Sequence, residues 1–178
     1  TVHTLASGSS GNAAVLSCGD THLLLDAGIS CRRITTALNA LGLSPELLSS
    51  ILITHTHSDH ISGLRTLLKK TDCPILATPR TCRELCCRLE GIDGRLMELE
   101  APVQMGEAGI TPVITSHDAP GSCGWRLDTG DGSVGFLTDT GYVTEEAADL
   151  LPGVDLAILE ANHDVEALRS GPYPYYLK

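Results

Sequence analysis

The first 26 residues alternate between short apolar runs and small polar segments. Apolar runs lie at residues 2–6, 13–18 and 22–26, and they are separated by a Gly-Ser-Ser-Gly-Asn segment at 8–12 and by Gly19-Asp20. Short apolar runs bounded by Gly, Ser and Asp predict β-strands that are joined by turns. We therefore expect the chain to begin with three strands in antiparallel order.

Between residues 30 and 91 helical spacing alternates with short apolar runs. Ser30 precedes apolar residues that recur three and four positions apart up to Gly42, which predicts a capped helix. Thr78-Pro79 is a typical N-cap and first-turn pair for another helix. In chain order we expect a helix at 30–42, a short helical turn from 44, a strand at 50–54, a helix at 61–68, a strand at 74–77 and a helix from 78 to near 91.

From about Leu96 the pattern becomes rich in strands again, with Gly and Asp turns between apolar runs. Strand clusters on both sides of a helical stretch predict an α/β fold, with two sheets face to face and helices outside, an αββα four-layer sandwich. In chain order we expect strands at 109–116, 123–129 and 133–138, a helix capped by Thr144 up to 151, a buried strand at 155–160 and a last helix at 164–170.

Length and composition fit a single domain over residues 1–178. The hydrophobic content is 42%, and no apolar run approaches the roughly 18 residues of a membrane helix. The first residues lack the basic and apolar regions of a signal peptide. Seven cysteines, scattered and without a Cys-x-x-Cys pair, are typical of reduced thiols. We expect a cytoplasmic protein with no membrane partner.

Three histidines and an aspartate are concentrated at residues 55–60, directly after the apolar run at 50–54. Alternate side chains of an extended segment share a face, so His55 and His57 are expected to bind one ion. Asp59 and His60, displaced by the following turn, are expected to serve a second ion. Imidazole and carboxylate ligands favour zinc or manganese, with iron as an alternative. The competing interpretation is three unrelated histidines on a polar loop, which this density of ligands disfavours.

Further ligating residues follow later apolar runs. His117 comes after the run at 109–116, Asp139 after the run at 133–138, and Glu160 and His163 after the run at 155–160. Taken alone, His117 reads as a surface histidine and Asp139 as a turn residue. Each ion of the upstream motif has two protein ligands and still lacks a third. We therefore interpret His117 as a ligand and Asp139 as a bridging carboxylate. Glu160 and His163 stay open between a surface and a catalytic role.

These residues resemble the metallo-β-lactamase superfamily, whose signature is His-x-His-x-Asp-His after a strand, followed by a later His and a later Asp. The chain is more closely similar to the WalJ/YycJ family, bacterial proteins of that fold described as 5′-3′ exonuclease-like. The resemblance runs from end to end of the chain. The matching segments, in order, are residues 5–12, 24–28, 116–119, 138–142, 160–164 and the Tyr-Pro-x-x-Leu-Lys segment at 173–178.

The resemblance implies roles for individual residues. It places His55, His57 and His117 on one ion, Asp59 and His60 on the other, and Asp139 between them. It further implies that Asp26 orients a ligand imidazole and that residues 8–12 line the site as a flexible loop. Similar proteins continue past the Leu-Lys pair with further His-containing segments. We therefore expect an incomplete C-terminal part of the fold and a weakly held second ion.

The function expected from these residues is metal-dependent phosphodiester hydrolysis of nucleic acid, DNA rather than RNA. Two divalent ions about 3.5–4 Å apart would share a hydroxide and neutralise the transition state. Asp59 belongs to this catalytic centre, and Glu160 or His163 would protonate the leaving group. The absence of a Gly-x-Ser-x-Gly elbow and of a P-loop lysine excludes serine-hydrolase and P-loop chemistry.

Charge bears on this expectation. The net charge of −10 disfavours nonspecific binding of polyanions, yet Lys and Arg residues cluster after the motif. Such a cluster is typical of a solvated helix face, so its role stays open. A thioester or lactam hydrolase of the same fold is one alternative function, and a non-catalytic metal-binding module is another. The clustered residues are Arg65, Lys69, Lys70, Arg80, Arg83 and Arg88.

Overall fold

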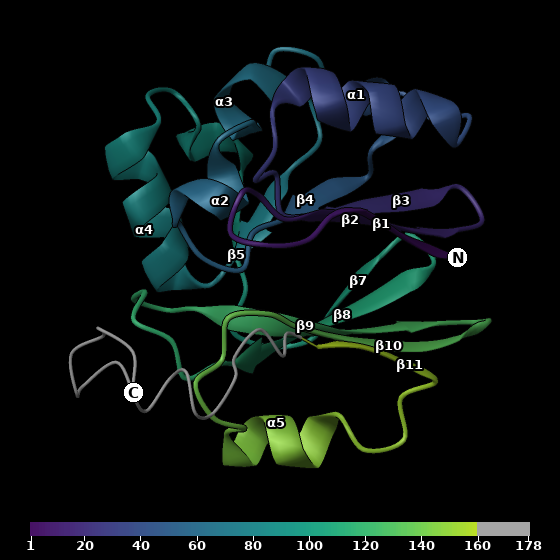
Figure 1. The fold of residues 1–178 in the computed structure, drawn as a ribbon, viewed down its shortest axis with the longest axis vertical. Coiled ribbons are helices and arrows are strands. Elements are labelled where there is room, and N and C mark those ends of the chain that lie inside the picture. Colours follow the sequence, from purple (N-terminus) through teal and green to yellow (C-terminus); the bar gives the residue numbers. More distant parts are fainter. Residues whose placement is uncertain (160–178) are drawn as a thin grey trace.

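The computed structural model describes residues 1–159, and two β-sheets packed face to face form its centre (Figure 1). Helices α1 (Cys31–Ala40), α3 (Leu64–Leu67) and α4 (Pro79–Arg88) cover the outer face of the first sheet. Helix α5 (Glu145–Leu150) covers the outer face of the second sheet. The predicted αββα layering is therefore confirmed.

The first sheet has the strand order β1-β2-β3-β4-β5-β6. Its first three strands are antiparallel, as predicted, and the others pair in parallel because helices connect them. Two single 3-10 turns, η1 (Pro45–Leu47) and η2 (Asp93–Arg95), precede β4 and β6. The strands are β1 (Val2–Ala6), β2 (Ala13–Cys18), β3 (Thr21–Leu25), β4 (Ser50–Leu52), β5 (Ile75–Ala77) and β6 (Leu96–Glu98).

The second sheet has the order β11-β10-β9-β8-β7. Its strands are antiparallel except for β10 and β11, which pair in parallel because α5 connects them. The strands are β7 (Val103–Met105), β8 (Ala108–Ile114), β9 (Cys123–Thr129), β10 (Gly132–Leu137) and β11 (Leu156–Leu159).

One apolar core joins the two sheets. Leu23 and Leu52 of the first sheet pack in the same cluster as Trp125 and Phe136 of the second, and all four side chains are buried. Burial of apolar area at roughly 25 cal/mol per Å² is the main force that holds such layers together. The shared core fixes the ends of strands from both sheets close to one another, which is where the candidate ligands lie.

The helix predicted at 61–68 is wrong as a continuous element. The structure instead has two short helices, α2 (Ser58–Ile61) and α3, with Gly63 between them. A Cβ atom on Gly63 would lie 2.1 Å from the carbonyl oxygen of Ile29. The break therefore lets this stretch approach the backbone that follows β3, a tertiary requirement that helical periodicity does not report.

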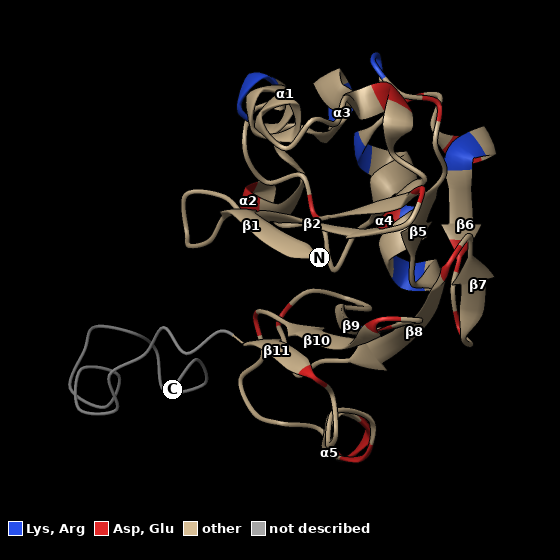
Figure 2. Cartoon of the chain, turned by 90° about the vertical axis from the view of Figure 1, so that its right-hand side faces the viewer, with Lys and Arg blue, Asp and Glu red and all other residues tan. Residues whose placement is uncertain are grey.

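Basic residues are concentrated on one half of the molecule. Apart from Arg126, all Lys and Arg of the described part lie between residues 32 and 95. Figure 2 shows them mainly on the helical layer of the first sheet, whereas acidic residues occur in both halves. Within residues 1–159, no helix combines the length and the apolar character needed to cross a bilayer.

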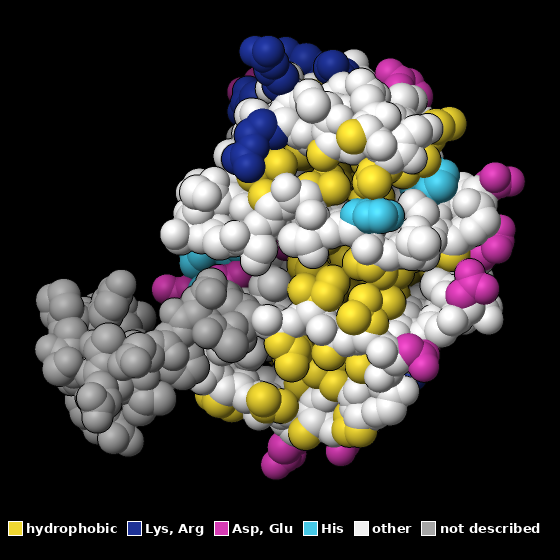
Figure 3. All heavy atoms as spheres, turned by 45° about the vertical axis from the view of Figure 1, so that its right-hand side comes forward, with side chains coloured by type: hydrophobic (Ala, Val, Ile, Leu, Met, Phe, Trp, Pro, Cys, Tyr) yellow, Lys and Arg dark blue, Asp and Glu magenta, His cyan; other side chains and the backbone are white. Residues whose placement is uncertain are grey.

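Strand β11 is the outermost strand of its sheet in the described part of the chain, and the prediction that it is buried is wrong. Leu156 and Leu159 are 46% and 59% exposed. The apolar run predicted the strand correctly, but periodicity alone does not say whether a strand is central or at an edge. Figure 3 shows further apolar side chains open to solvent on one face of the molecule. Glu160, His163 and the helix predicted at 164–170 lie outside the described residues.

Candidate metal centre

The candidate ligands lie at the ends of strands from both sheets. Strand β4 leads into the loop that carries His55 and His57, strand β8 leads to His117, and strand β10 leads to Asp139. His57 is the extended N-cap of α2, with φ −63° and ψ 152°. The chain therefore changes from extended to helical directly after His57. That change places Asp59 and His60 in the first turn of α2.

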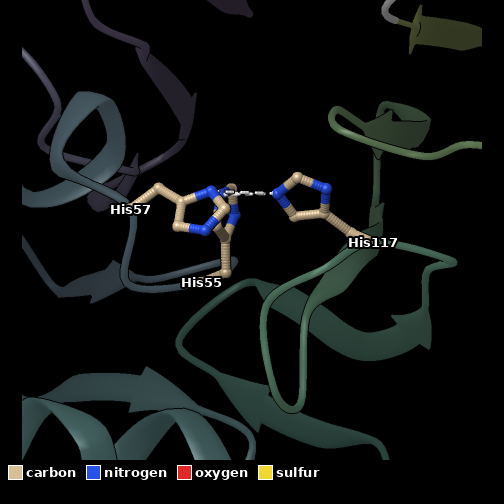
Figure 4. A group of neighbouring side chains, drawn as sticks. All are labelled: His55, His57 and His117. Carbon is tan, nitrogen blue, oxygen red and sulfur yellow. Dashed lines mark hydrogen bonds between the residues drawn. The ribbon is translucent and has the colours of Figure 1, made fainter. Parts of the chain in front are cut away.

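Three imidazoles form a first group of candidate ligands (Figure 4). The Nε2 atom of His117 lies 3.2 Å from Nε2 of His55 and 3.1 Å from Nδ1 of His57. All three nitrogens lie within 4.8 Å of one another. Three imidazole nitrogens that converge in this way form the donor set that zinc and similar transition metals prefer.

A second group surrounds Nε2 of His60. This nitrogen lies 2.9 Å from Oδ2 of Asp139 and 3.6 Å from Oδ2 of Asp59. The side-chain amide of Asn12 lies 3.0 Å from the same nitrogen. The tightest set of possible ligands here is His55, His60 and Asp139, so His55 contributes to both groups, whereas the sequence assigned it only to the first. The His55 and His60 ring centroids are only 4.0 Å apart, which explains the difference.

Asp26 and Thr54 contact the Nδ1 atoms of His60 and His55, the ring nitrogens that do not face the other ligands. The fully buried Asp26 carboxylate lies 2.8 Å from Nδ1 of His60 and accepts hydrogen bonds from the backbone amide and hydroxyl of Thr54. The Thr54 hydroxyl also lies 3.1 Å from Nδ1 of His55. Partners of this kind fix the tautomer and the direction of a ligand imidazole. Asp26 therefore lies where the family resemblance placed it.

Asp118 engages the outer nitrogens of the other two histidines. Its Oδ1 atom lies 3.3 Å from Nδ1 of His117 and 3.8 Å from Nε2 of His57. Each of the four imidazoles thus has a polar neighbour at one ring nitrogen, while its other nitrogen faces the shared space. This arrangement fits metal binding, because an ion needs one free lone pair from each ring.

Two carboxylates of the site have backbone strain. Asp26 and Asp139 have φ values of 58° and 54°, and they are the only residues other than Gly with positive φ in the described part of the chain. Aspartate tolerates this left-handed region better than most residues. Each lies just after a strand, and each aims its carboxylate at a nitrogen of His60. Such strain persists where the surrounding structure holds a functional geometry.

Burial and neighbouring charges shift the pKa values of the site histidines in opposite directions. Burial, together with the His60 and His117 imidazoles, lowers the pKa of His55 to about 3. Burial also lowers the pKa of His117. Burial opposes protonation of His60 as well, but its hydrogen bonds with Asp139 and Asp26 outweigh this and raise its pKa to about 10. Burial raises the pKa of Asp139, yet the hydrogen bond with His60 leaves it lowered. At neutral pH, in the metal-free chain, His60 is therefore a charged imidazolium, whereas His55 is a neutral imidazole with one ring proton.

The opposite pKa shifts predict how the stability of the metal-free chain depends on pH. The pKa of His60 is raised, so protonated His60 stabilises the fold fully below about pH 6.5, and this is lost as pH rises through about 10. The pKa of His55 is lowered, so stability falls as pH decreases from about 6.5 towards 3. We expect His60→Gln to remove much of the alkaline decline in the free energy of unfolding. Denaturant titrations of chelator-treated protein across this range would measure it, and an unchanged decline would contradict the assignment.

Helix α4 connects the two loops that carry the first group of ligands. The hydroxyl of Thr56, between His55 and His57, donates to the Glu84 carboxylate, and Arg88 donates to the Thr56 carbonyl at 2.7 Å. At the other end of α4, the hydroxyls of Thr78 and Thr81 donate to the carbonyl of Gly121, at 2.7 and 3.1 Å. Gly121 belongs to the loop that follows His117. One helix therefore fixes the distance between ligands from different sheets.

The contact between Thr56 and Glu84 predicts an effect on metal affinity. We expect Thr56→Val to weaken zinc binding by about 10- to 100-fold, because the loop between His55 and His57 loses its buried anchor. Thr56→Ser keeps the hydroxyl and should bind zinc nearly as the wild type does. Competition with a chromophoric chelator measures both affinities. Equal affinity of the valine variant and the wild type would show that α4 does not position this loop.

Several residues of the site were not predicted from the sequence as parts of it. Thr54 was assigned only to a strand, and Asp118 was noted only in a motif. A threonine directly before a ligand histidine is a usable signal, since its buried hydroxyl needs a partner. Glu84 gives no local signal, because it is an ordinary helix residue until the fold places it against Thr56.

Comparison with known proteins identifies relatives of this chain. Residues 21–171 match the family described as the beta-lactamase superfamily domain. The chain is 38% identical to exodeoxyribonuclease WalJ of Streptococcus pneumoniae serotype 2 over 98% of this chain and 66% of that protein. It is 33% identical to exodeoxyribonuclease YycJ of Bacillus anthracis over 98% of this chain and 67% of that protein. The chain thus spans about two thirds of the length of these relatives.

The fold also resembles solved structures. A metallo-beta-lactamase from Cronobacter sakazakii superposes with a TM-score of 0.69 at 17% sequence identity, over 88% of this chain and 69% of that one. At this identity the likeness concerns the fold alone. It agrees with the two facing sheets.

Proposed function

The chain belongs to the metallo-β-lactamase superfamily, and from this premise we propose that it is a metal-dependent phosphodiesterase that cleaves nucleic acid. The observation that supports the proposal best is the convergence of imidazole nitrogens from both sheets on one space. Each of these rings has a polar neighbour at its other nitrogen. The exodeoxyribonuclease names of the two relatives support the choice of nucleic acid, and of DNA rather than RNA.

Two ions fit the donor set. His55, His57 and His117 would hold the first, and His60 with Asp139 and Asp59 the second, with His55 close to both. Mixed imidazole and carboxylate ligands favour zinc or manganese, with iron as an alternative. When bound, such ions supply an activated water and neutralise the charge that develops on a phosphodiester.

The chain's own residues prepare this site for the ions. Asp26 accepts a hydrogen bond from Nδ1 of His60 and so directs its Nε2 lone pair into the site. Thr54 links the same carboxylate to His55. Asp139 reaches the site from the second sheet, and the Asp59 carboxylate lies near the same nitrogen of His60. The two expected proton donors, Glu160 and His163, lie outside the described residues, and their role remains a prediction.

The proposal is tested by assays with single-stranded DNA and with bis-p-nitrophenyl phosphate, each with added manganese or zinc. A thioester and a cephalosporin are assayed beside them. We expect cleavage of both phosphodiesters, and loss of that cleavage in Asp139→Asn. Cleavage of the thioester or the cephalosporin alone would favour a small-molecule hydrolase, to which the net charge of −10 also lends support. Less than one bound ion per chain with no hydrolysis would favour a non-catalytic metal-binding module.

The state of the cysteines indicates the cell compartment in which this activity would take place. All seven cysteines are free thiols. Thiols persist where the surroundings are reducing, so we propose the cytoplasm.

A further inference from the structure

A hollow of ≈ 850 Å³ extends from His117 along the start of helix α4. Its lining includes the loop after His117, from Asp118 to Ser122, and the first half of α4. The hollow thus begins at a candidate ligand and leads away from the metal centre. A volume of this size accommodates more than the reacting group of a substrate.

Two arginines of α4, Arg80 and Arg83, line this hollow. Both are exposed, and the side chain of neither makes a hydrogen bond or an ion pair with another described residue. Arg88 and Arg95, in contrast, donate to backbone carbonyls. Residues three apart on a helix are neighbours on one face, with Cβ atoms about 5–6 Å apart. Arg80 and Arg83 therefore present two unpaired charges side by side.

The other lining residues limit what would bind here. Apolar groups such as Leu99 and Ile114 form part of the surface, and among the described lining residues the His117 imidazole is the only aromatic ring. Glu100 and Glu146 add negative charge, while the carboxylate of Asp118 faces His57 and His117. Phosphate groups are the ligands that suit two free guanidinium groups in such a place.

We propose that Arg80 and Arg83 bind successive phosphates of a single nucleic-acid strand that leads into the metal centre. This inference rests on the proposed function and gives it a direction, since the strand would cross the first half of α4 before it reaches His117. It assigns a role to two members of the basic cluster whose function the sequence left open. Binding would depend on the backbone rather than on base identity.

Binding of a fluorescent single-stranded oligonucleotide of about 12 nucleotides to the manganese-loaded chain tests this. Arg80→Ala with Arg83→Ala should weaken binding at least about tenfold and reduce the slope of log affinity against log salt by about 1.4, or about 0.7 for each phosphate. Arg32→Ala with Arg33→Ala, which removes two exposed arginines of α1, is the matched control and should change neither. Replacement of Arg80 and Arg83 by lysine should restore part of the affinity.

Hydrolysis of bis-p-nitrophenyl phosphate separates the two proposals, because this ester has a single phosphate, which the metal centre would bind, and no further phosphate for the arginines. We expect the Arg80 and Arg83 double variant to hydrolyse it as the wild type does. Equal DNA affinity of this variant and the wild type, or no DNA binding by the wild type, would overturn the inference. DNA binding that depends on Arg80 and Arg83, without hydrolysis of either phosphodiester, would uphold the inference and reject the proposed function.

Discussion

Replacing His55 with alanine is expected to remove bound metal from both groups of ligands at once. His55 is the residue that the two groups share, and its ring lies against both His60 and His117. We expect zinc affinity to fall more than about 100-fold, beyond the usual effect of losing a residue that only orients a ligand. Metal content per chain after dialysis, measured by elemental analysis, gives the result directly.

Comparison with single-group variants makes the His55 result specific. His57→Ala should lower metal binding at the first group and leave the second largely intact, because His57 belongs to the first group alone. His3→Ala, which removes an exposed histidine of β1, serves as the control and should retain all metal. If His55→Ala lost no more metal than His57→Ala, His55 would belong to one group only.

Asp26→Ala is expected to cause the second large effect, on stability as well as on metal binding. The Asp26 carboxylate is fully buried and accepts hydrogen bonds from the backbone and side chain of Thr54 besides its contact with His60. Its removal leaves these donors without a partner, and we expect the free energy of unfolding to fall by about 2–4 kcal/mol. Chemical denaturation of the metal-free variant and wild type measures the difference.

Asp26→Asn separates the two roles of this residue. Asparagine tolerates the positive φ of 58° and still offers an oxygen to Thr54, so most of the stability should remain. Its amide would donate to Nδ1 of His60, so the ring proton would move to Nε2, where the ion must bind. We expect a folded variant that loses the second ion. A variant that keeps both ions would show that Asp26 supports the fold without setting the His60 tautomer.

Local sequence patterns predicted most elements well. Strands β1, β2 and β9 have the predicted bounds, and Ser30, Thr78 and Thr144 are the helix N-caps. These features depend on neighbours along the chain, such as a hydroxyl that accepts a bond from an amide three residues on. The errors were non-local. The helix at 61–68 breaks because backbone from another segment approaches Gly63, and β11 is exposed because it is the outermost described strand of its sheet.

The sequence by itself determined which residues are candidate ligands, since four of them occur within residues 55–60 and the others follow apolar strands. It also determined the αββα architecture, because the periodicities that indicate strands and helices depend on residues that are neighbours in the chain. Only the tertiary structure decided that His55 serves both groups, that Glu84 anchors Thr56, and that Arg80 and Arg83 face the hollow beside His117. Those relations join residues far apart in the chain, and packing of the two sheets and α4 sets their distances.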